Sequence, residues 1–233
     1  MEKYFAQRRR GAKQILRVKD NLTPFFFAPL RLCAKYFSTP RARNDYATHV
    51  PILIGLARMR EIRNVLEFGC GHYSTLTFLN RTAFPHLERL QSIENDASWA
   101  ETMKASVNDD RCILSLVTGE IADRVRELDL EAFDLILIDD SKTSAQRAST
   151  IRAIAARQTQ RPWIVIHDFE VEEYRKAAIG FKQRHTFRAY NPHTGLVCNK
   201  TLDVKLIEQL VKKNSKTLEP DDLEGWLTVF GKS

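Results

Sequence analysis

Short apolar runs alternate with segments of helical periodicity from residue 62 onward, and this alternation constrains the fold more than any other feature. Continuous hydrophobicity is typical of strands that are covered on both faces, as in a parallel sheet between two layers of helices. The sequence therefore predicts a doubly wound α/β fold with three layers. The expected strands are 64–68, 90–93, 112–117, 133–138 and 163–166, and the expected helices are 46–59, 74–80, 97–107, 121–128, 144–156 and 171–183.

Two later runs, 185–190 and 195–199, are also strand-like, and a short stretch rich in turn formers, 191–194, separates them. Only an antiparallel pair can be joined by so short a loop. We therefore expect a mostly parallel sheet that is closed by a C-terminal antiparallel hairpin. An amphipathic helix is expected over 201–214, and the role of 218–233 stays open.

Positive charge is concentrated in the first 43 residues of this 233-residue chain. They hold eleven Lys and Arg against two acids and so carry +9; because the whole chain carries +7, the other 190 residues carry −2. We predict a basic N-terminal helical extension over 1–43, a Rossmann-like domain over 44–214 and a C-terminal tail over 215–233. Because the main domain is not basic, no nucleic-acid partner is predicted.

The basic extension contains an arginine run, 8–10, and a phenylalanine cluster, 25–27. Three roles remain open for it: peripheral contact with an anionic membrane, contact with RNA phosphates, or a helical lid and dimer contact in a homo-oligomer. A lid or packing role is favoured.

Cysteine usage and the apolar segments indicate the compartment. The four cysteines at 33, 70, 112 and 198 form no C-x-x-C pair, which disfavours a disulfide scaffold or structural zinc and is typical of a reducing compartment. The apolar stretch 24–30 is too short to span a bilayer, and the N-terminus lacks the features of a secretory signal. We predict a cytoplasmic protein.

A glycine-containing turn follows the first predicted strand and marks the candidate ligand site. The strand contains Glu67, the turn contains Gly69 and Gly71, and a helix begins near Ser74. Glycines permit a tight turn and let a ligand approach the backbone closely. In an open α/β sheet, ligands bind beyond the carboxyl ends of the strands, which is where this turn lies.

The second predicted strand ends at Glu94, followed by Asn95, 23 residues beyond Gly71. An acid at this position can accept hydrogen bonds from both hydroxyl groups of a ribose. Together with the glycine turn, Glu94 predicts an adenosine site; the alternative is a solvated strand end.

These residues resemble the class I S-adenosylmethionine-dependent methyltransferases over about residues 46–200, chiefly in the segment 65–71. Tyr73 stands where that family commonly has a third glycine. The resemblance implies that Glu67 lies near the methionyl ammonium of the cofactor and that Glu94 binds the ribose. The implied cofactor-binding residues are Glu67, Gly69, Gly71, Ser74, Glu94, Asn95, Gly119, Glu120 and Asp139, of which Gly119 and Glu120 would lie near the adenine and Asp139 near the methionine moiety or the substrate.

The ends of the fourth and fifth strands carry candidate catalytic residues: Asp139, His167 and Asp168, with Asp140 and Glu170 beside them. Two chemistries remain open. His167 or Asp168 could take a proton from the methyl acceptor, or Asp139 or Asp140 could bind a divalent cation together with Asp168.

The resemblance to metal-dependent O-methyltransferases is incomplete, because Phe169 stands where those enzymes have Asn or Asp. No residue is therefore assigned as a metal ligand. We expect Asp140 to cap the following helix. Arg147 and Arg152 on that helix are expected to be solvated, and contact with an anionic substrate is the alternative. His49 would either reach over the cofactor or pack in the interior.

The predicted function is transfer of a methyl group from S-adenosylmethionine to an oxygen or nitrogen of a small or medium-sized acceptor. An NAD(P)-dependent oxidoreductase and a non-catalytic cofactor-binding protein are the alternatives. A dinucleotide needs three glycines beneath its pyrophosphate, whereas this turn has two, and an ionised Glu67 would repel the pyrophosphate. Methylation of base amino groups is disfavoured, because the Asn/Asp-Pro-Pro-aromatic motif is absent after the fourth strand.

Overall fold

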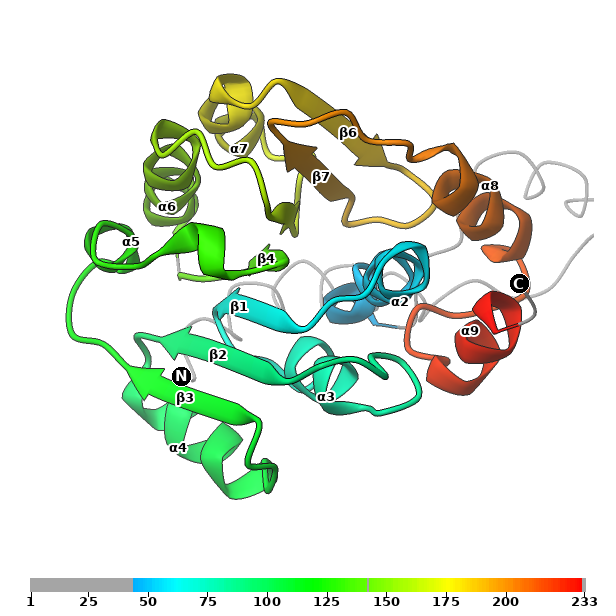
Figure 1. The fold of residues 1–233 in the computed structure, drawn as a ribbon, viewed down its shortest axis with the longest axis horizontal. Coiled ribbons are helices and arrows are strands. Elements are labelled where there is room, and N and C mark those ends of the chain that lie inside the picture. The colour runs from blue at the N-terminus through cyan, green and yellow to red at the C-terminus, as the bar shows by residue number, and fades with distance from the viewer. Residues whose placement is uncertain (1–43, 142, 232–233) are drawn as a thin grey trace, which may run out of the picture. The chain divides into compact units, whose positions relative to one another are not determined.

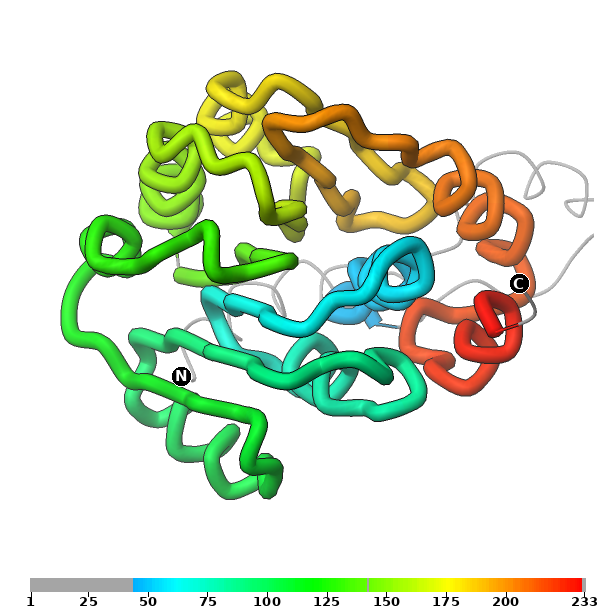
Figure 2. The backbone as a smooth tube through the Cα atoms, in the orientation of Figure 1, coloured from blue at the N-terminus to red at the C-terminus, as the bar shows by residue number. Residues whose placement is uncertain are grey.

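The computed structural model of the chain describes residues 44–141 and 143–231, which Figures 1 and 2 draw in colour. The predicted basic extension, 1–43, lies outside the described residues. No helix among the described residues has the length and apolarity needed to cross a bilayer.

A seven-stranded sheet forms the centre of the fold, in the order β3-β2-β1-β4-β5-β7-β6. The pairs among the first five strands are parallel, and β7 is antiparallel to both β5 and β6. This confirms the predicted mostly parallel sheet with a C-terminal antiparallel hairpin. The strands are β1 (Asn64–Phe68), β2 (Arg89–Glu94), β3 (Cys112–Leu116), β4 (Leu135–Ile138), β5 (Trp163–Ile166), β6 (Gln183–Phe187) and β7 (Thr194–Cys198).

Helices cover the two faces of the sheet with separate apolar clusters, as the three-layer prediction requires. Neighbouring residues of one strand serve opposite clusters: Leu137 contributes to the first and Ile138 to the second. The first cluster includes α2 (Val50–Met59), α3 (Ser74–Leu79), α8 (Lys205–Asn214) and α9 (Leu223–Phe230). The second includes α5 (Ile121–Val125), α6 (Ser144–Ala156) and α7 (Glu172–Ala177), while α4 (Ala97–Ser106) contacts β2 and β3.

Two segments near the C-terminus are not as the sequence predicts. The single helix expected over 171–183 is wrong in its second half, because α7 gives way to a 3₁₀ turn (Ala178–Gly180) and β6 already begins at Gln183. Residues 218–233, whose role the sequence leaves open, contain α9. Its Trp226 is fully buried, and α9 packs against α2.

The strand register determines which side chains meet at the carboxyl edge of the sheet. Phe68 is paired with Ile93 on one side and with Ile138 on the other, and Ile138 is paired with Ile166. Residues that follow these positions therefore emerge at one edge. They include Gly69, Glu94, Asp139 and His167.

Candidate active site

The turn after β1 requires glycine at position 69. Gly69 has a φ of +82°, a conformation that residues with a Cβ rarely adopt. A Cβ there would lie 2.4 Å from the backbone oxygen of Asp139, which directly follows the neighbouring strand β4. Gly71 differs, because its φ is ordinary and a Cβ would meet only the Ser74 Oγ, at 3.3 Å. The close approach of the neighbouring strand thus requires glycine at position 69. The absence of a side chain at Gly71 instead leaves space beside the turn for a ligand.

Glu67 lies fully buried on β1, directly beneath this turn. Its Oε2 accepts hydrogen bonds from Thr75 Oγ1 at 2.8 Å and from the Ser92 hydroxyl. Its Oε1 has no hydrogen-bond partner among the described residues. Burial raises the pKa of the Glu67 carboxyl to about 7, against the opposing effect of the Ser74, Ser92 and Thr75 hydroxyls. The site therefore contains a desolvated carboxyl group whose Oε1 forms no hydrogen bond among the described residues, with the Ser74 hydroxyl close to the carboxyl.

Glu94 ends β2 and is also buried. Its Oε1 accepts hydrogen bonds from the backbone N–H groups of Asn95, at 2.7 Å, and Asp96, at 2.8 Å. Its Oε2 has only a weak contact, from the Cys70 thiol at 3.7 Å. Burial raises the pKa of Glu94 above its usual value. The backbone amides thus fix this carboxylate and leave Oε2 as the oxygen able to accept a ligand hydroxyl.

The turn is held in place from α4. Trp99 Nε1 donates a hydrogen bond to the Cys70 backbone oxygen at 2.6 Å, and the His72 ring packs edge-on against the Trp99 ring with centroids 5.3 Å apart. Of the other predicted cofactor residues, Ser74 begins α3 and Asp139 follows β4, whereas Asn95, Gly119 and Glu120 lie in the loops that follow β2 and β3. Asn95 Nδ2 donates to the Gly119 backbone oxygen at 3.5 Å, which joins the loops that follow these two strands.

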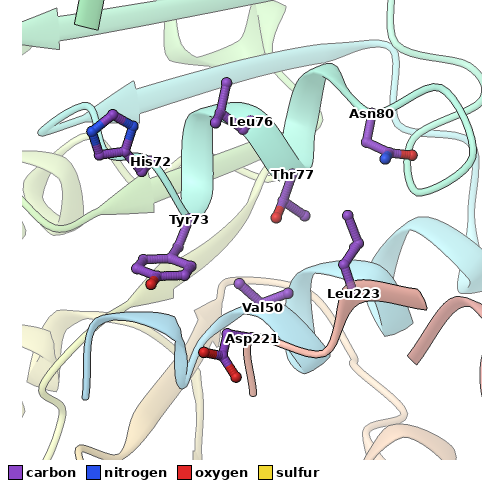
Figure 3. A pocket seen from close by; sticks show the side chains of 8 residues that line it. All are labelled: Val50, His72, Tyr73, Leu76, Thr77, Asn80, Asp221 and Leu223. Carbon is purple, nitrogen blue, oxygen red and sulfur yellow. The ribbon is translucent and has the colours of Figure 1, made fainter. Parts of the chain in front are cut away.

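A pocket of about 260 Å³ lies beside the turn, between α2, α3 and the segment before α9. Figure 3 shows the Tyr73 ring pointing from the start of α3 towards α2, where Val50 lies. The Tyr73 hydroxyl accepts a hydrogen bond from the Asn44 side chain. The bulk that replaces the third glycine is therefore accommodated in this pocket. Its lining residues include none of the predicted cofactor residues.

Arg147 on α6 joins the acids that follow β4 and β5. Its guanidinium lies 2.9 Å from Asp139 Oδ1 and 3.0 Å from Asp168 Oδ2. Its Nε donates to the Asp140 backbone oxygen at 2.7 Å, and its guanidinium lies over the Tyr174 ring at 5.3 Å. Although burial opposes the charge, the surrounding carboxylates raise the pKa of Arg147. The predicted solvated Arg147 is therefore wrong, because the side chain is only 9 % exposed.

His167 is buried between two polar partners. Its Nε2 lies 2.9 Å from Thr48 Oγ1, and its Nδ1 lies 3.2 Å from Asp139 Oδ1. Burial opposes protonation, but the Asp139 carboxylate and its hydrogen bond raise the pKa of His167 above its usual value. His49 packs edge-on against His167 with ring centroids 4.9 Å apart. Burial, followed by the neighbouring His167, lowers the pKa of His49 to about 3.

Asp168 differs from His167 in exposure and backbone conformation. Its side chain is 32 % exposed, against 3 % for His167. Its φ of +56° lies in the left-handed region, which is uncommon for a residue with a Cβ and recurs at functional sites. Of the three predicted catalytic residues, Asp168 is thus the most accessible to an acceptor.

Two other acids do not join this group as expected. Asp140 is fully buried, and its carboxylate accepts hydrogen bonds from Ser141 and Thr150 at 2.7 and 2.8 Å. The prediction that Asp140 caps the next helix is wrong, since Thr143 is the N-cap of α6. Glu170 instead accepts a hydrogen bond from the backbone N–H of His193, in the loop before β7.

Sequence reasoning missed the residues that support these acids: Thr48, Cys70, Thr75, Ser92 and Arg147. They are ordinary residue types in regular elements, and only the fold brings them to the acids. One signal was available for Thr75, because it lies one helical turn beyond Gly71, to whose N–H its hydroxyl is bonded.

The chain matches no family model and none of the curated proteins with which it was compared. Among solved structures, human methyltransferase-like protein 13 in complex with SAH is 20 % identical over 78 % of this chain and 92 % of its own, with a TM-score of 0.52. Spermidine synthase from Thermotoga maritima is 16 % identical over 80 % of this chain and 69 % of its own, with a TM-score of 0.50. Identities this low establish the shared fold and not a shared reaction. The second neighbour is named a synthase and not a methyltransferase, so this fold alone does not specify one reaction.

Proposed function

We propose that this chain, which has the fold of the class I methyltransferases, transfers a methyl group from S-adenosylmethionine to an oxygen or nitrogen of a small or medium-sized acceptor. The observation that carries the proposal is the pair of buried carboxyl groups, Glu67 and Glu94, on adjacent strands beside the Gly69 turn. Each has an oxygen with weak or no hydrogen bonding within the protein.

The two acids fit opposite ends of the cofactor. The free Oε1 of Glu67 can accept a hydrogen bond from a cationic amino group, and the Oε2 of Glu94 can accept one from a ribose hydroxyl. Two buried acids would repel the pyrophosphate of a dinucleotide but attract an ammonium or sulfonium group. This charge pattern favours S-adenosylmethionine over NAD(P).

The chemistry at β4 and β5 supports methyl transfer to a protic acceptor. The cofactor, when bound, supplies an electrophilic methyl group. Asp168 is accessible enough to accept a proton from an acceptor hydroxyl or amine. Both ring nitrogens of His167 already have protein partners, so we assign it a positioning role with Asp139 and Arg147.

Calorimetric titration with S-adenosylhomocysteine tests the cofactor assignment. We expect saturable binding to the full chain, and about 100-fold weaker binding to Glu94→Ala, because a hydrogen bond to a charged group contributes roughly 1.5–3 kcal/mol. Glu101→Ala, an exposed acid on α4, is the matched control and should bind like the unmodified chain. Heat with NADH but none with S-adenosylhomocysteine would favour the oxidoreductase alternative and overturn the proposal.

A second prediction concerns the pH dependence of that binding. Because the pKa of Glu67 is raised to about 7, the free site is mostly protonated below that pH. A cationic ligand end favours the carboxylate, so binding should release a proton, and affinity should fall up to about tenfold per pH unit as the pH drops below 7. Calorimetry at pH 6 and 8 measures this effect. Glu67→Gln should remove the dependence; an unchanged slope in that variant would show that another group titrates.

A further inference from the structure

Three side chains at the start of α2 and the ends of β4 and β5 form a compact cluster of metal-binding groups. His49, Asp139 and His167 each offer one ligand atom, and these atoms all lie within 4.8 Å of one another. His49 is 1 % exposed and His167 3 %, while Asp139 is partly exposed. The cluster therefore combines two imidazoles with one carboxylate at the partly open edge of the sheet.

Within the cluster, His49 is the residue whose polar atoms the fold leaves unsatisfied. Neither of its ring nitrogens has a hydrogen-bond partner among the described residues, although both are buried. An unsatisfied buried polar atom costs roughly 1–3 kcal/mol, and such atoms in native proteins commonly mark a bound water or ion. The nearest polar groups of the cluster are themselves metal-binding types. A ligand that both nitrogen and oxygen donors can hold would account for His49.

His167 is oriented as metal-binding histidines are. Its Nε2 lies 2.9 Å from the Thr48 hydroxyl, which holds the ring from the side away from the cluster. Its Nδ1 faces Asp139 Oδ1 at 3.2 Å. Metal-binding histidines generally use one nitrogen for the metal and the other for a fixed polar partner. The ligand atoms of a tetrahedral zinc ion lie roughly 3.4 Å apart, so Asp139 and His167 already have this spacing.

Arg147 adjoins the cluster at Asp139 and has a second carboxylate partner. Its guanidinium contacts Asp139 Oδ1 at 2.9 Å and Asp168 Oδ2 at 3.0 Å, and its Nε donates to the Asp140 backbone oxygen. A cation at Asp139 would take the place of this guanidinium contact, with Arg147 remaining bound to Asp168.

We propose that His49, Asp139 and His167 bind a divalent transition metal of the zinc class. Two imidazoles and one carboxylate favour zinc and its neighbours over magnesium or calcium, which prefer oxygen ligands. Three protein ligands leave at least one coordination position open, as in catalytic rather than structural zinc sites. The site does not depend on the proposed methyl transfer.

Titration of the metal-free, untagged full chain with Zn²⁺ tests this assignment. We expect one calorimetric site per chain and at least 100-fold weaker binding to His49→Gln, His167→Gln and Asp139→Asn. His185→Gln is the matched control, because His185 is a half-buried histidine beside one carboxylate, Glu208, and should leave binding unchanged. Absence of a saturable site, or equal binding in the three variants and the control, would overturn the proposal.

Thermal unfolding provides a second test, which does not depend on comparing zinc affinities between variants. His49→Leu removes the two unsatisfied nitrogens, so the metal-free variant should unfold at a higher temperature than the metal-free parent. Saturating Zn²⁺ should raise the unfolding temperature of the parent and not that of His49→Leu. An equal rise in both would contradict the assignment. Titration with S-adenosylhomocysteine separates the two proposals. His49→Leu should bind S-adenosylhomocysteine as the parent does. A parent that binds S-adenosylhomocysteine but not Zn²⁺ would refute only the metal site.

Discussion

Gly69→Ala should reduce the free energy of unfolding by about 2–5 kcal/mol. The left-handed backbone at φ +82° costs a residue with a Cβ roughly 1–2 kcal/mol. The added Cβ would also lie 2.4 Å from the Asp139 backbone oxygen, and relieving that overlap must separate β1 from β4, at a further cost of about 1–3 kcal/mol. Urea unfolding of the full chain measures the change.

Gly71→Ala is the matched control in the same turn. Its φ is ordinary, and its Cβ would meet only the Ser74 Oγ at 3.3 Å, so we expect a loss of less than about 1 kcal/mol. The same variant should weaken S-adenosylhomocysteine binding, because the Cβ would point into the space left for the ligand. Equal destabilisation by both substitutions would contradict the different roles given to the two glycines.

Arg147→Met should cost about 3 kcal/mol of stability at neutral pH. The substitution keeps most of the volume of the side chain but removes the charge that Asp139 and Asp168 share. Breaking a buried ion pair by removing one partner leaves uncompensated charge, which is costly. Arg152→Met, at an exposed position on the same helix, should change stability by less than about 0.5 kcal/mol.

The cost of Arg147→Met should depend on pH, because part of it comes from the Asp139 carboxylate. Burial alone would raise the pKa of Asp139, but His167 and Arg147 outweigh it and hold that pKa well below its usual value. The stability from the Asp139 carboxylate is therefore present above the unfolded pKa, about 3.9, and is lost as the pH falls towards the depressed value. The difference between Arg147→Met and the parent should therefore stay constant between pH 7 and about pH 4 and shrink as the pH falls further. A difference that also stays constant below that pH would mean that lost packing, and not charge, explains the cost.

The fold could be predicted because its main signals are local. The continuous apolar runs specify strands buried on both faces, and the turn-rich stretch 191–194 is too short for a parallel connection. The bounds of β1 and β5 agree with the prediction. The end of α7 could not be predicted from the sequence. The helical pattern of 171–183 continues across the 3₁₀ turn and into the start of β6, where the chain reaches the sheet edge.

The candidate site was predictable only in the residues that end strands. Glu67, Glu94, Asp139 and His167 follow from the position of strand ends in an open sheet. Their supporting groups depend on tertiary distance instead. Thr48 lies 119 residues before the ring that it contacts.

The burial of Arg147 could not be predicted from the sequence either. An arginine on an amphipathic helix is ordinarily solvated, and nothing local distinguishes it from Arg152. What buries Arg147 is the convergence of α6 on the ends of β4 and β5, which sequence patterns do not encode.

A crystal structure of the full chain with S-adenosylhomocysteine tests the central claim most directly. The account predicts that the ligand lies across the carboxyl ends of β1 and β2, with its amino group at Glu67 Oε1 and a ribose hydroxyl at Glu94 Oε2. A ligand bound elsewhere, for example in the pocket lined by Tyr73 and Val50, or an empty edge at saturating ligand, would contradict it.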